Sequence, residues 1–256
     1  EAKTIVDRGT YITQWRYDSQ NRVTQMFYPN GDRISYDYNH QGEIVQLNSY
    51  YQTILQSRVF DQNGRVIEQK FGNGSTTHYE YETWTGAAGA IKKIQSGLSL
   101  NSNDVSLQNL SYAYDLVGNI TRIDDDGEIL NFTYDALNRL KSVSGAYAES
   151  YDYDPNTGNL MRKAGSGDYC YSSGKPHAVT GYEGKDHLFE YDANGQMIKR
   201  HGQNIRYDAQ GNLVSYLGKT YFYDGDGKRV AMVHPDGKTT IYIGNYYETV
   251  WIPIDD

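Results

Sequence analysis

Several residue types are scarce in this sequence of 256 residues, and each scarcity excludes a class of protein. A single cysteine, Cys170, excludes an internal disulfide framework and a cysteine-based zinc site. The 24 Lys and Arg against 32 Asp and Glu give a formal net charge of −8, so nucleic-acid binding through a basic face is not expected. No stretch approaches the ~20 apolar residues of a membrane helix, so membrane insertion is not expected either.

Bulky apolar residues other than tyrosine are scarce as well. Leu, Ile, Val and Phe make up about a fifth of the residues, close to the composition at which a chain stays disordered. The 26 tyrosines compensate, so a core must consist largely of phenol rings whose hydroxyls need hydrogen-bond partners. The 26 glycines and only 5 prolines favour β-structure with many turns. Because the sequence starts at Glu1 without Met or a signal peptide, we expect a processed product or an excised piece of a longer protein.

An internal repeat organises the sequence. An aromatic residue followed by Asp recurs, with Gly or Asn three positions after the Asp. Successive aromatic anchors lie 16 to 33 residues apart, which suits two short strands and two turns per unit. Each unit is therefore predicted to be a β-hairpin. The regular copies are Tyr17 and Asp18 with Asn21, Phe60 and Asp61 with Gly64, Tyr114 and Asp115 with Gly118, Tyr134 and Asp135 with Asn138, Tyr191 and Asp192 with Gly195, Tyr207 and Asp208 with Gly211, and Tyr223 and Asp224 with Gly227.

The chemistry of a tight turn explains this signature without any appeal to function. An Asp at the first position of a type I turn accepts backbone N–H bonds, and the fourth position favours Gly or Asn because it often needs positive φ. An aliphatic residue two positions later restarts the next strand with its side chain inward. The twenty or so signature residues are therefore predicted to be structural. Less regular copies start at Tyr38, Tyr81, Tyr153 and Tyr171.

The segment 82–113 is the main irregularity. It separates two anchors by 33 residues and contains Gly86-Ala87-Ala88-Gly89. We interpret it as a longer hairpin with an extended tip, with a domain boundary there as the alternative. No amphipathic helix is expected anywhere. The sequence thus predicts a single array of about ten to eleven hairpin units over residues 1–256.

These motifs resemble the Rhs/YD-repeat family, which includes bacterial Rhs polymorphic toxins, wall-associated proteins, the C component of insecticidal toxin complexes and, more distantly, the animal teneurins. The resemblance covers nearly the whole chain. Beyond the Tyr-Asp repeats it extends to three sequence motifs, namely His177-Ala178-Val179-Thr180, Tyr223-Asp224-Gly225-Asp226-Gly227 and Tyr242-Ile243-Gly244-Asn245-Tyr246-Tyr247-Glu248.

The resemblance implies an all-β fold in which consecutive antiparallel hairpins form one long curved or spiralling sheet, part of a hollow shell. It also implies a secreted or cell-surface location, and two partners: the remainder of the parental shell and a C-terminal toxin segment absent from this chain. The family's shell-closing segment, rich in Asp-Pro and Gly and self-cleaving, has no match after Tyr247. Neither a protease site nor a toxin is therefore expected here.

The candidate chemical sites each have a stronger structural interpretation. The acidic runs Asp124–Glu128 and Asp224–Gly227 suggest calcium, but neither fits the register of an EF-hand loop, so acidic turns are favoured. No pair of the six histidines has metal-ligand spacing, and His177 is expected to bond at a turn. Cys170 has no identifiable activating base and is interpreted as a strand residue. We predict no catalytic, metal or cofactor site.

Tyrosine pairs leave one binding alternative open. Exposed aromatic rows can stack on sugars, although cross-strand ladders worth about 0.2–1 kcal/mol per pair are the favoured interpretation. The unpaired strands at the two ends of an open sheet further predict edge-to-edge self-association. The pairs in question are Tyr50-Tyr51, Tyr151 with Tyr153, Tyr169 with Tyr171, and Tyr246-Tyr247.

We therefore expect a non-catalytic structural section of a secreted or surface Rhs-type shell that encloses or presents a toxin or effector. The alternative is a cell-surface adhesion module that binds carbohydrate or protein through exposed aromatic residues. A third hypothesis, a polysaccharide-active enzyme, requires a convergent pair of carboxylates that the sequence does not locate.

Overall fold

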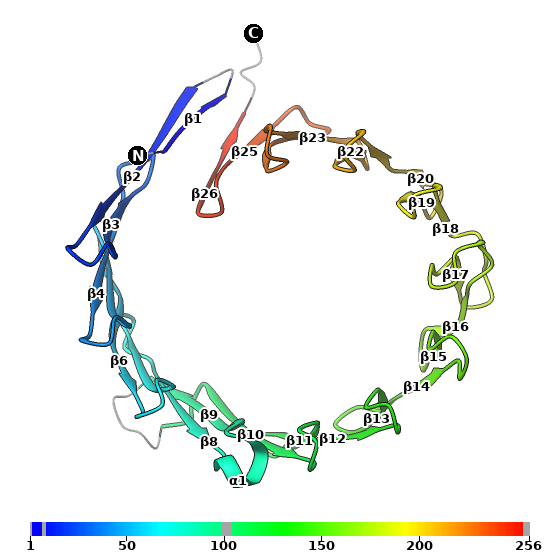
Figure 1. Ribbon diagram of the computed structural model, residues 1–256, viewed down its shortest axis with the longest axis horizontal. Coiled ribbons are helices and arrows are strands. Elements are labelled where there is room, and N and C mark those ends of the chain that lie inside the picture. Colours follow the sequence, from blue (N-terminus) through cyan, green and yellow to red (C-terminus); the bar gives the residue numbers. More distant parts are fainter. Residues whose placement is uncertain (1, 7–8, 99–103, 253–256) are drawn as a thin grey trace. The chain divides into compact units, whose positions relative to one another are not determined.

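The computed structural model describes residues 2–6, 9–98 and 104–252 (Figure 1). In these residues the chain forms 26 strands and one helix of four residues. The chain divides into two compact units, Glu1–Ala148 and Glu149–Asp256, and each unit is described by itself. The fold is all-β and consists of consecutive antiparallel hairpins, as the sequence predicts.

The first unit is a run of thirteen strands in which each strand pairs antiparallel with the next one along the chain. Connections therefore alternate between the two edges of the sheet, with the Tyr-Asp turns on one edge and the other turns on the opposite edge. The strands are β1 (Ala2–Val6), β2 (Gly9–Tyr17), β3 (Val23–Phe27), β4 (Arg33–Tyr38), β5 (Ile44–Ser49), β6 (Thr53–Phe60), β7 (Val66–Phe71), β8 (Thr76–Tyr81), β9 (Ile91–Gly97), β10 (Gln108–Tyr114), β11 (Ile120–Asp125), β12 (Glu128–Tyr134) and β13 (Leu140–Gly145).

The second unit repeats the same antiparallel pattern with shorter strands. It contains three runs of strands, β14 through β17, β18 through β20 and β21 through β26. Within each run, every strand pairs with the next one along the chain. The strands are β14 (Glu149–Tyr153), β15 (Leu160–Lys163), β16 (Gly167–Cys170), β17 (Gly181–Tyr182), β18 (Phe189–Tyr191), β19 (Met197–Arg200), β20 (Gln203–Asn204), β21 (Arg206–Tyr207), β22 (Leu213–Tyr216), β23 (Lys219–Tyr223), β24 (Arg229–Val233), β25 (Thr239–Ile243) and β26 (Tyr247–Trp251).

A register shift precedes the aromatic residue of almost every repeat. Arg16 pairs with Gln25 but Tyr17 pairs with Val23, so one residue of the returning strand has no partner. Such a β-bulge bends the strand and increases its twist. The same shift occurs at Tyr38, Phe60, Tyr81, Tyr114, Tyr134, Tyr153, Tyr191, Tyr207 and Tyr223.

The sheet has little interior to bury. The chain exposes 16384 Å² to solvent, whereas a globular protein of 29.1 kDa exposes about 11,400 Å². The buried apolar side chains among the described residues are accordingly few: Met26, Leu55, Val143, Ile241 and Ile243. Hydrogen bonds along the strands and contacts between neighbouring hairpins must therefore supply much of the stability.

The segment 82–113 begins with a turn that contains a short helix, and strands β9 and β10 then pair as a hairpin. The turn after Tyr81 contains a one-turn helix, α1 (Trp84–Ala87), which ends at Ala88 in the left-handed conformation with φ +49°. Strand β9 then pairs with both β8 and β10. A displaced glycine thus marks a longer turn that closes into one helical turn, which the sequence analysis did not anticipate. No helix in the described part of the chain has the length and apolar character to span a bilayer.

Two glycines, Gly127 and Gly145, allow the stability cost of a strained backbone conformation to be distinguished from the cost of a steric clash. Gly145 and Gly127 both have positive φ, +124° and +96°. A Cβ at Gly145 would lie 1.9 Å from the Ile129 carbonyl oxygen, whereas a Cβ at Gly127 meets no atom within 4 Å. Gly127→Ala is therefore expected to cost about 1 kcal/mol of unfolding free energy, and Gly145→Ala about 1–3 kcal/mol more. Equal urea midpoints for the two variants would contradict this packing.

Candidate functional site

The repeated turn is built around the Asp of each signature. Asp61 Oδ1 accepts the backbone N–H groups of Asn63 at 2.8 Å and Arg65 at 2.9 Å. The Asp61 carbonyl accepts the N–H of Gly64 at 3.1 Å, and the Asp61 N–H donates to the Arg65 carbonyl at 2.8 Å. One carboxylate therefore satisfies the amides that the turn leaves without strand partners.

The same turn recurs throughout the described chain. The carboxylates of Asp18, Asp115, Asp135, Asp208 and Asp224 accept the N–H groups two and four residues further on. Asp192 accepts the N–H of Gln196 at 2.9 Å. The fourth residue has positive φ in each case, namely Asn21, Gly64, Gly118, Asn138, Gly195, Gly211 and Gly227.

A side chain from the end of the turn closes several of these loops. The Arg65 guanidinium lies 2.7 Å from Asp61 Oδ2, and Arg22 and Arg139 make the equivalent ion pairs with Asp18 and Asp135. The hydrogen bond from the Arg65 backbone N–H is the largest cause that lowers the pKa of Asp61, and the guanidinium lowers it further against an opposing effect of desolvation. The ionised carboxylate is thus the form that the turn stabilises.

The tyrosine of most repeats is bonded to the repeat before it. The Tyr134 hydroxyl donates to the Ile120 carbonyl at 2.7 Å, and Ile120 is the strand partner of Tyr114, the preceding anchor. The hydroxyl therefore reaches the backbone at the bulge of the neighbouring hairpin. The equivalent bonds, of 2.6 to 3.1 Å, are Tyr38 to Val23, Tyr81 to Val66, Tyr114 to Ile91, Tyr171 to Leu160, Tyr191 to Val179, Tyr207 to Met197 and Tyr223 to Leu213.

Phe60 is the exception that identifies the role of the hydroxyl. Phenylalanine cannot donate a hydrogen bond to Ile44, the strand partner of Tyr38. Instead, an Arg58 guanidinium nitrogen lies 3.4 Å from the Ile44 carbonyl oxygen. Arg58 is itself positioned by bonds of 3.0 and 2.7 Å to Gln69 Oε1. The carbonyl at the bulge thus keeps a donor where the phenol is missing.

Cation–π contacts join some turns to the next tyrosine. The Arg22 guanidinium carbon lies 4.6 Å from the centre of the Tyr38 ring, and that of Arg65 lies 4.2 Å from the centre of the Tyr81 ring. Because the same arginines bind the turn aspartates, they connect the carboxylate of one repeat to the aromatic ring of the following one.

The phrase His177–Thr180 forms a hydrogen-bonded node in the second unit. His177 Nδ1 lies 2.7 Å from Asn159 Oδ1. The Thr180 hydroxyl, nearly fully buried, donates to Asp186 Oδ1 at 2.5 Å. Hydrogen bonds from Ser172, Thr180 and the His187 backbone lower the pKa of Asp186 to about 2. These contacts hold the loops together, and the His177 ring and the Thr180 hydroxyl are both engaged in structural hydrogen bonds.

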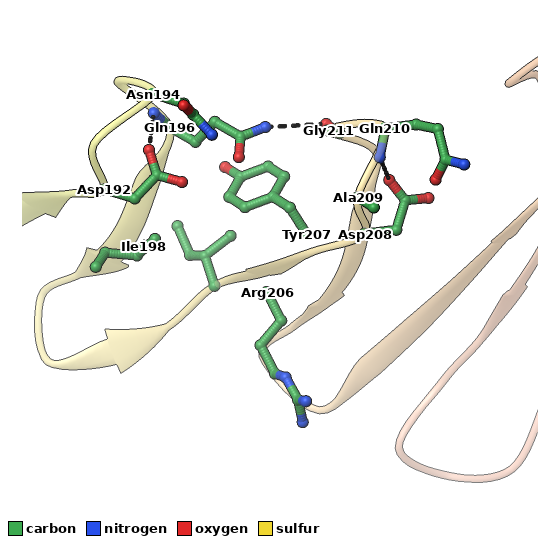
Figure 2. Close-up of a pocket in the computed structure, with 11 residues that line it drawn as sticks. Asp192, Asn194, Gln196, Ile198, Arg206, Tyr207, Asp208, Ala209, Gln210 and Gly211 are labelled. Carbon is green, nitrogen blue, oxygen red and sulfur yellow. Dashed lines mark hydrogen bonds between the residues drawn. The ribbon is translucent and has the colours of Figure 1, made fainter.

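The cavities found between turns follow from the repeat. Figure 2 shows a groove of about 590 Å³ between the turns that start at Asp192 and Asp208. Gln196 Nε2 donates to the Gly211 carbonyl across it at 3.4 Å, and Asp208 Oδ1 accepts the N–H of Gln210 at 2.9 Å. Similar grooves separate other successive turns. The groove is the gap between two neighbouring hairpin ends, with its carboxylates bonded to their own turns.

The other candidate residues are also held by structural contacts. Asp124 Oδ1 accepts the N–H of Gly127 at 2.9 Å, and Asp124 Oδ2 pairs with Arg122 at 2.7 Å. In the described residues, no group of three or more His, Cys, Asp or Glu side chains is arranged to hold a metal ion. Cys170 is a half-buried free thiol. Tyr50 and Tyr51 are 64% and 79% exposed, with ring centroids 5.1 Å apart.

The geometry defines a class of protein: consecutive β-hairpins in which tyrosine hydroxyls bond most repeats of each unit to the repeat before them. The teneurin YD-shell family matches residues 88–248. The chain belongs to this family.

Relatives and solved structures agree with this assignment. The chain is 28% identical to toxin subunits YenC1 and YenC2 of Yersinia entomophaga, over alignments of 148 and 151 residues. Each alignment covers 43% of this chain and 15% of the relative. The structure is also similar to the crystal structure of TcdB2-TccC3-Cdc42, with a TM-score of 0.77 and 21% identity over 93% of this chain and 14% of that one.

A second structural match comes from the structure of the Photorhabdus luminescens Tc holotoxin pore carrying the TccC3 mutation D651A, with a TM-score of 0.72 and 21% identity over 91% of this chain and 14% of that one. At this level of identity the structural matches establish the fold. The chain spans only about a seventh of the length of the relatives and chains it matches.

Sequence reasoning missed the acceptors of the tyrosine hydroxyls. It identified the aliphatic residue after each turn, for example Val23, Ile120 and Leu213, only as an inward side chain. The structure shows that the backbone carbonyl of the same residue receives the next tyrosine. Two features of the sequence could have indicated these acceptors. Each repeat contains one aliphatic residue after its turn and one tyrosine, and the repeat of Phe60, which lacks the tyrosine, has an arginine two residues before the phenylalanine.

Removal of one hydroxyl tests the contact between repeats. Tyr134→Phe leaves the Ile120 carbonyl without its donor and is expected to lower the unfolding free energy by about 0.5–1.5 kcal/mol. Tyr17→Phe is the matched control, because the Tyr17 side chain is 54% exposed and its hydroxyl makes none of the hydrogen bonds found among the described residues. Urea unfolding measured by circular dichroism gives both values. Equal losses in the two variants would contradict the role of the hydroxyl.

Acid sensitivity tests the carboxylates of the turns. The folded-state pKa values of Asp18, Asp61 and Asp135 are lowered, chiefly by the backbone N–H of the residue four positions on. Their stabilisation is therefore complete above the unfolded-state pKa of about 3.9 and is lost as pH falls through the lower folded-state values. We expect the urea midpoint to be nearly constant from about pH 7 to 5 and to fall below about pH 4.

Asp61→Asn is the variant for this test, since Asn39 already makes the same two backbone contacts with an amide oxygen. The variant is expected to be less stable than the wild type at neutral pH, because it loses the ion pair with Arg65. The difference should shrink as pH falls below 4. A difference that stays constant down to pH 2.5 would show that the Asp61 charge does not contribute.

Proposed function

We propose that this chain is a non-catalytic section of the wall of a secreted or surface-located Rhs-type shell that encloses or presents a toxin or effector segment. The observation that carries the proposal is the hydrogen bond that the tyrosine hydroxyl of most repeats donates to the backbone of the repeat before it. Such a contact can be repeated along any number of hairpins, so the wall can be extended without a globular core. The name of the relatives, toxin subunit, supports the toxin part of the proposal.

The same proposal gives a structural role to the signature residues and to the array as a whole. Tyr, Asp and Gly or Asn of each copy serve as structural residues of the wall, and residues 1–256 act as one array of about ten to eleven hairpin units. Covalently attached partners are the remainder of the parental shell and its toxin segment. Edge-to-edge association through unpaired strands stays a prediction.

The proposed wall is expected to act without cofactor, metal or substrate. The carboxylates of the turns support this, because their oxygens accept amide hydrogen bonds of their own turns. A glycoside hydrolase instead places two carboxyl groups across a substrate cleft, about 5–9.5 Å apart. The grooves between turns hold carboxylates engaged in turn bonds.

The experiment uses the complete polypeptide that contains this sequence. Its toxin segment is expected to resist added protease while the wall is folded, and to be cleaved once acid unfolds the wall, at a pH below the lowered folded-state pKa values of the turn carboxylates. A control protein with the toxin segment fused to an unrelated folded domain should be cleaved both at neutral and at acid pH, with a protease that is active at the pH of each measurement. Cleavage of the segment at neutral pH, at the rate of the control, would overturn an enclosing function.

A second candidate function is adhesion through exposed aromatic residues. The observation that favours it is the pair Tyr50 and Tyr51, which present two largely exposed rings at 84° to each other. An adhesion module predicts glycan-array signals that disappear in the Tyr50→Ala, Tyr51→Ala double variant. An array without signals from a folded sample would remove this candidate.

A further inference from the structure

Three adjacent turns on one edge of the first unit carry exposed apolar side chains. Leu116 is 103% exposed, Leu137 72%, Val117 71% and Trp84 65%. These residues occupy the tips of the turns after Tyr81, Tyr114 and Tyr134. We call them the apolar turn edge. Single exposed apolar residues are common on proteins, but neighbouring ones on a shared edge indicate a contact surface.

The strand order places these tips next to one another. Strands β8 to β13 pair consecutively, so the turns β8–β9, β10–β11 and β12–β13 all lie on one edge. A bond of 3.0 Å from Asn119 Nδ2 to Asn138 Oδ1 fixes the second turn to the third. The turns that carry Leu116 and Leu137 are therefore joined directly, and the turn that carries Trp84 is the preceding turn on the same edge.

Other Tyr-Asp turns of the same unit show that the fold does not require apolar tips. The corresponding exposed positions are Ser19 and Gln20 in one turn and Gln62 and Asn63 in another. These turns have the same carboxylate hydrogen bonds as the turns of Asp115 and Asp135. The apolar residues at the tips thus have a reason other than turn formation.

The carboxylates next to Leu116 and Leu137 are engaged in bonds of their own turns, and the Arg65 guanidinium carbon lies 5.6 Å from the centre of the Trp84 ring. The Asp115 carboxylate is bonded to the amides of Val117 and Asn119 and to the Asn119 side chain. The Asp135 carboxylate is paired with Arg139 at 2.7 Å. The carboxylates beside Leu116 and Leu137 are thus neutralised or hydrogen-bonded within their own turns, which reduces like-charge repulsion when an identical edge approaches.

The size of the row fits a weak self-contact. Four side chains with these exposures offer roughly 500–600 Å², near the upper end of the largest apolar patch of a monomer. Two such edges would bury about 1,000–1,200 Å² in total, at the lower limit of specific interfaces. A contact of this size is expected to be reversible, with dissociation in the micromolar to millimolar range.

We propose that the apolar turn edge docks against the apolar turn edge of a second copy of this chain, in a two-fold symmetric contact. Symmetry of this kind uses the same surface on both copies, so association stops at the dimer. Pairing through unpaired strands at the sheet ends would instead add copies one after another. The two kinds of self-association are thus distinguishable by the size of the product.

The test is sedimentation velocity of the 256-residue chain from 5 to 500 μM. We expect a reversible monomer–dimer equilibrium whose dissociation constant rises at least tenfold in the Leu116→Asn, Val117→Thr, Leu137→Asn triple variant. A Gln20→Asn, Asn63→Gln variant changes the same tip positions in polar turns and should dimerise like the wild type. Circular dichroism and urea midpoints establish that all three proteins are folded, as expected for exposed positions.

Three outcomes would overturn the proposal. The chain could remain monomeric at 500 μM, or the triple variant could dimerise as tightly as the wild type. An open-ended series of oligomers would show that copies add through other surfaces, such as strand edges. Loss of the dimer in the triple variant alone supports the docking surface and leaves the proposed wall function to its own test.

Discussion

The structure depends on one hydrogen bond that is repeated along the chain: the tyrosine hydroxyl of a hairpin donates to a backbone carbonyl of the hairpin before it. The acceptor lies at a β-bulge, where the strand ladder is interrupted. A buried carbonyl without a donor is costly, by about 1–3 kcal/mol. The carbonyl at the bulge therefore needs a hydrogen-bond donor from outside the strand ladder, and the tyrosine hydroxyl of the following repeat supplies it.

This arrangement explains why a chain with few aliphatic residues can fold. In the first unit each strand pairs with the next one along the chain, and only a handful of the described side chains are fully buried. Phenol rings pack beside the turns while their hydroxyls reach the neighbouring backbone, so one residue type provides both apolar area and a polar contact. The ion pairs between turn aspartates and arginines then fix the turn from which the next strand starts. Stability becomes a property of neighbouring repeats rather than of a central core.

The hairpins and their turns could be predicted from sequence because their determinants are local. Asp61 and Gly64 are the first and fourth residues of one tight turn, so their roles depend only on a four-residue segment. The positive φ at Asn21, the fourth residue of another such turn, follows from the same chemistry. The acceptor of Tyr134, by contrast, depends on the register between two hairpins, which no local pattern states. Helix α1 was missed because a displaced glycine near Gly86 signals only a longer turn. The compensation of Phe60 by Arg58 required the register as well, and the exposed row at Leu116 and Leu137 required the strand order.

The measurement that tests this account most directly is an alkaline titration of the tyrosines, followed by phenolate absorbance and circular dichroism together. Desolvation raises the pKa of several hydroxyls that donate to a neighbouring hairpin, among them those of Tyr81, Tyr114 and Tyr134. A phenolate cannot donate a hydrogen bond, so these groups should ionise only as the sheet unfolds. The account predicts a late phase of phenolate absorbance that coincides with loss of the β-sheet signal. Complete, reversible ionisation of all 26 tyrosines with the sheet signal intact would contradict it.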